Sequence, residues 1–70
     1  MTLKKCSFSI GGHRTSVALE PEFWAVLEAD AKRNGKILAV FVADIDKKRG
    51  TKPLASALRV HALAAAKGTH

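Results

Sequence analysis

Two short segments near the start of the chain alternate between hydrophobic and polar residues. They cover residues 4–10 and 13–19. A period of two is typical of a β-strand with one buried face. Between the segments, Gly11-Gly12 supplies the positive φ angles that a tight hairpin turn needs. The pattern predicts a β-hairpin, and a disordered N-terminal arm is the alternative. The expected inward residues are Cys6, Phe8, Ile10, Thr15, Val17 and Leu19.

A first helix is predicted directly after the hairpin, from Pro21 to about Asn34. Pro21 suits the first helical position because its φ is fixed and it lacks an N–H group, and the acidic residues beside it complement the positive end of the helix. Asn34-Gly35 is a typical stop, because glycine readily adopts the left-handed conformation. Phe23 and Trp24 are expected in the core or in a dimer interface.

The second predicted helix, from about Leu38 to Lys48, is apolar nearly all round. Such a helix must be covered on several sides. Because seventy residues offer little cover, the economical arrangement is a homodimer in which this helix packs against its own copy and against the first helix. A third, alanine-rich helix is expected to start near Pro53 or Leu54 and to run to about Ala66. Residues 67–70 are expected to fray.

Composition narrows the class of protein. Seventy residues make one domain, residues 1–70, and a core of this size often needs a second subunit. The net charge of +6 indicates either a polyanionic partner or a contribution to solubility. With Cys6 as the only cysteine and no secretory signal, the chain is expected to be cytoplasmic and free of disulfides, with Cys6 partly buried. No apolar run is long enough to span a membrane.

Catalytic and metal-binding motifs are not found in the sequence. The histidines and the cysteine lack the spacing of a zinc site, and no serine or cysteine stands in a nucleophile motif. Gly11-Gly12 joins two strands and does not precede a helix as a phosphate loop does. We therefore expect no enzyme, no metal and no cofactor. Arg59 is expected at the surface, in a salt bridge to Asp44 or Asp46.

A strand, a helix, an Asn-Gly turn and an apolar second helix in this order resemble the ribbon-helix-helix superfamily of DNA-binding proteins, the MetJ and Arc type. Residues 12–24, 43–46 and 56–59 are similar to a small bacterial ribbon-helix-helix family with an added N-terminal strand and third helix. This resemblance implies an α+β fold in which an N-terminal β-hairpin precedes three helices, and an intertwined homodimer. One strand from each chain would pair antiparallel and enter the DNA major groove.

The resemblance also implies which strand residues read DNA. Arg14, Ser16 and Ala18 would face the base edges. The fork of Arg14 suits a paired contact with guanine, Ser16 can donate or accept a hydrogen bond, and Ala18 offers only a contact with a thymine methyl group. Other members commonly have a long polar residue at the place of Ala18.

At the start of the second helix, members often carry a capping Ser, Thr or Asn beside a bound DNA phosphate. Ile37 takes that place here. The resemblance still implies that backbone amides of Lys36, Ile37 and Leu38 face a phosphate, with the Lys36 side chain in support. The predicted dimer interface consists of Thr15, Val17, Leu19, Phe23, Trp24, Phe41, Val42 and Ile45.

The sequence therefore predicts a homodimeric protein that binds double-stranded DNA, either a small transcriptional regulator or an antitoxin-like autoregulator with a toxin as a further partner. The alternative is a dimeric protein-interaction module that keeps the fold without sequence-specific DNA binding.

Overall fold

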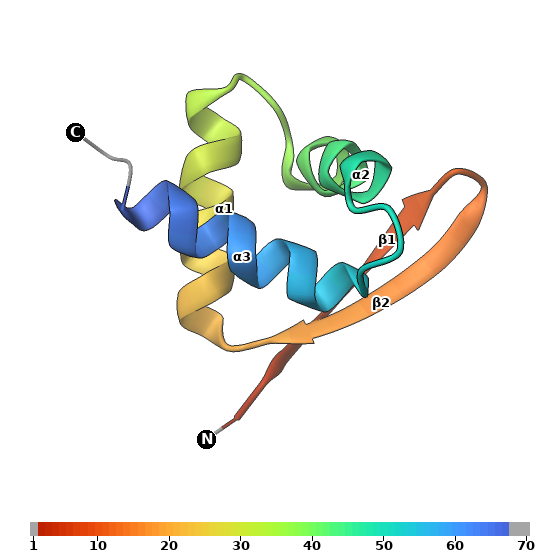
Figure 1. The fold of residues 1–70 in the computed structure, drawn as a ribbon, viewed down its shortest axis with the longest axis horizontal. Helices are drawn as coiled ribbons and strands as arrows, with labels where there is room; N and C mark the ends of the chain where they lie inside the picture. Colours follow the sequence, from red (N-terminus) through yellow and green to blue (C-terminus); the bar gives the residue numbers. More distant parts are fainter. Residues whose placement is uncertain (1, 68–70) are drawn as a thin grey trace.

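The computed structural model describes residues 2–67, which form a β-hairpin and three helices gathered on one side of it (Figure 1). The elements are β1 (Lys4–Ile10), β2 (His13–Leu19), α1 (Pro21–Arg33), α2 (Leu38–Lys48) and α3 (Leu54–Lys67). The predicted hairpin is confirmed, and so are the three helices, to within one residue at each end. Fraying was expected for residues 67–70, which is wrong for Lys67 because it belongs to α3, and residues 68–70 lie outside the described residues. No helix within residues 2–67 has the length and apolar character needed to cross a membrane.

The two strands of the hairpin pair along their whole length. β1 and β2 are antiparallel, with Lys4 opposite Leu19 and Ile10 opposite His13. Gly11 and Gly12, with φ angles of 57° and 81°, form the two-residue turn. Positive φ at both turn residues matches the twist of the flanking strands. The alternating side chains consequently divide into one face toward the helices and one face away from them.

α1 begins and ends where the sequence indicates. The carbonyl oxygen of Glu20 accepts the amides of Phe23 and Trp24 at 2.9 and 3.3 Å, and Pro21 stands at the start of the helix. At the other end, Gly35 has a φ of 68°, and its amide donates to the carbonyl of Lys32. This left-handed glycine closes the helix and turns the chain toward α2.

α2 is covered by its own chain. Phe41, Val42 and Ile45 are buried against β1, α1 and α3, which are all elements of the same molecule. One chain therefore already covers these three side chains, and packing of α2 against a second copy stays a prediction. The third helix provides the apolar surface that seventy residues were expected to lack. The start of α2 remains uncovered, with Ile37 and Val40 exposed.

The core joins all five elements. Trp24 is 1% exposed, its indole Nε1 donates to the carbonyl oxygen of Lys4 at 2.8 Å, and its ring lies 5.8 Å from that of Phe8. A buried indole N–H needs such a partner, so this bond holds β1 against α1. Cys6 is partly buried as expected. The buried side chains are Phe8, Val17, Leu19, Trp24, Leu27, Ala31, Phe41, Val42, Ile45, Leu58 and Ala62.

A long-range ion pair links α3 to the end of the hairpin. Arg59 donates to the Glu20 carboxylate from Nε and Nη2, both at 3.3 Å. The expected partners Asp44 and Asp46 were therefore wrong. The backbone amide of Glu20 and the Arg59 guanidinium lower the pKa of the Glu20 carboxyl, so this carboxylate is ionised at neutral pH.

Candidate functional site

The face of the hairpin that points away from the helices is polar. We call it the sheet face, and it consists of Lys5, Ser7 and Ser9 of β1 and Arg14, Ser16 and Ala18 of β2. All of these residues are exposed except Ala18, which is partly exposed. Their neighbours in sequence point into the core, so the sheet face has a fixed orientation.

The register pairs the six residues across the two strands. Lys5 lies opposite Ala18, Ser7 opposite Ser16, and Ser9 opposite Arg14. The two hydroxyl oxygens of Ser7 and Ser16 are 2.9 Å apart and share a hydrogen bond. The structure thus places Arg14, Ser16 and Ala18 together, as expected, and adds three β1 residues that sequence reasoning did not assign to the site. The alternation of polar and hydrophobic residues within residues 4–10 could have identified these three residues.

The hairpin is electropositive. Residues 1–19 contain Lys4, Lys5 and Arg14 but no aspartate or glutamate. Within residues 2–67, every ion pair lies in the helical part of the molecule or at its junction with the hairpin, and none involves these three cations. Their charge is therefore available to an external anion. The pairs are Arg33–Asp30, Lys36–Asp44, Arg49–Asp46, Arg59–Glu20 and His61–Asp30.

The turn between α1 and α2 differs from the predicted phosphate site. The amide of Lys36 donates to the carbonyl oxygen of Ala31 at 3.0 Å, so it is not available to a phosphate. The Lys36 ammonium pairs with Asp44, which neutralises its charge. Ile37 is 69% exposed and provides no side-chain cap. The amides of Ile37 and Leu38 are what remains of the predicted site.

Six of the eight predicted dimer-interface residues lie in the core of the single chain. They are Val17, Leu19, Trp24, Phe41, Val42 and Ile45. Thr15 and Phe23 are partly buried. Contact of these eight residues with a second copy stays a prediction.

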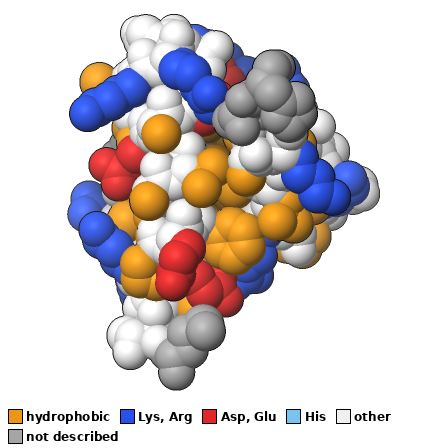
Figure 2. Space-filling view, turned by 90° about the vertical axis from the view of Figure 1, so that its left-hand side faces the viewer, with side chains coloured by type: hydrophobic (Ala, Val, Ile, Leu, Met, Phe, Trp, Pro, Cys, Tyr) orange, Lys and Arg blue, Asp and Glu red, His pale blue; other side chains and the backbone are white. Residues whose placement is uncertain are grey.

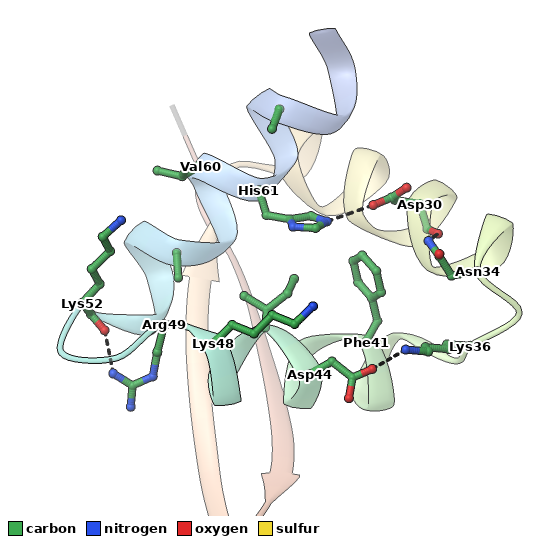
Figure 3. Close-up of a pocket in the computed structure, with 13 residues that line it drawn as sticks. Asp30, Asn34, Lys36, Phe41, Asp44, Lys48, Arg49, Lys52, Val60 and His61 are labelled. Atoms are coloured by element: carbon green, nitrogen blue, oxygen red, sulfur yellow. Dashed lines mark hydrogen bonds and ion pairs between the residues drawn. The ribbon is translucent and has the colours of Figure 1, made fainter. Parts of the chain in front are cut away.

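A groove of about 670 Å³ lies between the end of α1, α2 and α3 (Figure 3). Several of its polar groups bind one another. His61 Nε2 donates to Asp30 at 2.9 Å, its ring meets that of Phe41 edge-on at 5.1 Å, and Lys36 pairs with Asp44. The hydrogen bonds from His61 and Arg33 lower the pKa of the Asp30 carboxyl. Within residues 2–67, no three histidine, cysteine or acidic side chains form a group that could hold a metal ion.

The Asp30 contacts predict a specific sensitivity to acid. Because the pKa of Asp30 is lower in the folded state, its stabilising effect is present above the unfolded pKa of about 3.9 and is lost as pH falls through the folded value. Asp30→Asn is expected to remove this part of the acid dependence, which for a partly exposed pair is about 1 kcal/mol or less. Urea midpoints measured between pH 6 and pH 3 test this, with Glu28→Gln on the same helix as the control. Equal pH slopes for wild type and Asp30→Asn would contradict it.

Comparison with known proteins identifies a family. The sequence model described as "Ribbon-helix-helix domain" matches residues 3–66. This range begins just before β1 and includes all of α1 and α2 and nearly all of α3. No curated protein and no solved structure matches the chain.

Proposed function

The chain belongs to the ribbon-helix-helix domain family, and on this premise we propose that it is a homodimeric DNA-binding protein that places its β2 strands in the major groove. The sheet face is the observation that carries this proposal. It presents Arg14 and Ser16 outward on a strand whose other face is fixed in the core. Rigid support of this kind lets side chains read base edges, because their direction does not change on binding.

The free edge of β2 supports dimerisation. β2 pairs with β1 along one edge, and the two-stranded sheet within residues 2–67 leaves its other edge without a strand. An unpaired strand edge is a template for another strand. Addition of β2 from a second copy would give the order β1, β2, β2 and β1 and bring two copies of Arg14 to one surface. The chain in this proposal is a small transcriptional regulator or an antitoxin-like autoregulator, acting in the cytoplasm.

DNA binding by this protein is expected to depend strongly on salt. Each phosphate contact contributes roughly −0.9 to the slope of log K against log salt concentration. A binding selection from fragmented genomic DNA at near-physiological salt is expected to enrich a palindromic site with half-sites about one helical turn apart. Fluorescence anisotropy on the selected duplex then gives the slope, and sedimentation gives the mass of the free protein, expected at twice the 7.5 kDa of one chain.

Two results would contradict the proposal. A flat response to salt would mean that phosphates are not contacted. Recovery of random fragments would mean that the +6 charge binds DNA without reading its sequence.

A second candidate is a dimeric protein-interaction module, with a toxin as one class of partner. The face formed by α1 and the end of α3 supports it. Figure 2 shows hydrophobic side chains in the middle of this face and charged side chains around them. A shallow hollow there is lined by Val26, Ala29, Arg33, Ala65 and Ala66. Capture of a stable protein partner by this face, together with no DNA binding at low salt, would favour this second function.

A further inference from the structure

We propose that β1 is a second DNA-contacting strand, and that Lys5, Ser7 and Ser9 bind the phosphate backbones along the walls of the major groove. This inference rests on the proposed DNA-binding function and extends it. It gives β1 a role that a two-stranded ribbon does not have. It also separates the sheet face into central residues that read bases and flanking residues that hold phosphates.

The register of the hairpin places both sets of residues on one surface. Lys5, Ser7 and Ser9 lie directly opposite Ala18, Ser16 and Arg14. The alternate β1 residues are committed to the other side, where Phe8 is buried and Cys6 and Ile10 pack against the core. β1 cannot rotate its polar residues away from a ligand of β2 without exposing these apolar side chains.

The width of the groove decides what each strand meets. Neighbouring strands lie about 4.8 Å apart, so β2 strands paired about a twofold axis would lie roughly 2.4 Å from it and the β1 strands roughly 7 Å from it. The major groove is about 12 Å wide, and its walls are therefore about 6 Å from the same axis. The β2 strands fit between the walls, whereas the β1 strands lie over the sugar-phosphate backbones.

The β1 side chains have the chemistry that phosphates need. Lys5 is exposed, has no partner among the ion pairs of residues 2–67, and lies in a segment without carboxylates. The shared hydrogen bond between Ser7 and Ser16 uses one of their two hydroxyl hydrogens, and the other remains to donate to an outside acceptor. Serine and lysine donors of this kind commonly bind phosphate oxygens. The side chains of Ser7 and Ser9 on β1 are also short, which lets the backbone of β1 approach a groove wall closely.

Salt dependence tests the assignment of Lys5. In the dimer, Lys5→Gln removes two phosphate contacts, so the slope of log K against log salt should become shallower by roughly 1.8. The preference for the selected duplex over a scrambled one should stay within twofold of wild type, because phosphate contacts carry no sequence information. Lys67→Gln is the matched control. It removes the same charge at the far end of α3 and should leave the slope unchanged.

An introduced negative charge tests the serines. Ser9→Asp puts a carboxylate on the sheet face and should weaken binding of the selected duplex more than tenfold. Ser56→Asp, at an exposed serine in the first turn of α3, should change binding less than twofold. Circular dichroism of all four variants checks that they fold. If wild type binds its site while Lys5→Gln and Ser9→Asp behave like their controls, this inference is overturned and the proposed function stands. If wild type binds no DNA, the proposed function itself fails.

Discussion

Replacing Leu58 by alanine is expected to lower the free energy of unfolding by roughly 3 kcal/mol. Leu58 is 0% exposed and belongs to the core that α3 shares with the hairpin and the other helices. Its truncation would remove buried methyl groups and leave a cavity, and both effects destabilise the fold. A domain of this length has a total stability of only about 4–10 kcal/mol. Urea denaturation followed by circular dichroism measures the loss.

Leu63 provides the matched control on the same helix. It is 53% exposed, and Leu63→Ala makes the same chemical change outside the core. The decrease in the free energy of unfolding for Leu63→Ala should stay within about 0.5 kcal/mol. Similar losses for the two variants would mean that Leu58 of α3 does not complete the core of a single chain.

The hairpin and the helix ends were predictable because local signals determine them. A period of two, broken by two glycines, is compatible with few structures other than a tight hairpin. Asn34-Gly35 specifies the end of α1, because the left-handed conformation at Gly35 needs no tertiary contact. These features were confirmed almost to the residue.

The cover of α2 was not predictable in the same way. The apolar pattern of residues 38–48 shows that several sides of the helix must be buried, but it does not say whether the cover comes from the same chain. The alanine-rich third helix was not counted as cover for α2, yet Leu58 and Ala62 are fully buried in the core. The partner of Arg59 was missed for the same reason, because Glu20 is 39 residues away in sequence and only the fold brings them together.

The sequence predicted the β2 half of the candidate site but not the β1 half. The phase of β2 correctly gave Arg14, Ser16 and Ala18 a common face. The resemblance to a ribbon with one strand per chain directed attention to β2 alone, so the same phase in β1 was not used for Lys5. At the start of α2, the Lys36 amide was wrongly included, because its bond to Ala31 follows from the way α1 ends.

The sequence preference of the protein is expected to depend on Arg14. Arg14 is exposed on the sheet face, and on β2 it lies within the part of the sheet that fits between the groove walls. A bidentate contact with guanine provides roughly 1–3 kcal/mol of discrimination, so two half-sites give roughly 2–6 kcal/mol. Arg14→Ala should therefore erase most of the preference for the selected duplex over one with the contacted base pairs exchanged. Anisotropy titrations of both duplexes measure the ratio, and sedimentation should show the mass of the dimer unchanged.

Arg14→Lys separates the charge of this residue from its shape. Lysine keeps the positive charge but lacks the planar fork, so the variant should retain the wild-type salt slope and still lose most of the discrimination. Full discrimination in Arg14→Lys would show that a positive charge at this position is enough and that the planar fork is not required. Full discrimination in Arg14→Ala would move the reading of sequence to Ser16 and Ala18. Because Ala18 offers only methyl contacts and Ser16 shares its hydroxyl with Ser7, the result with Arg14→Ala would also imply that the shape of the DNA contributes to recognition.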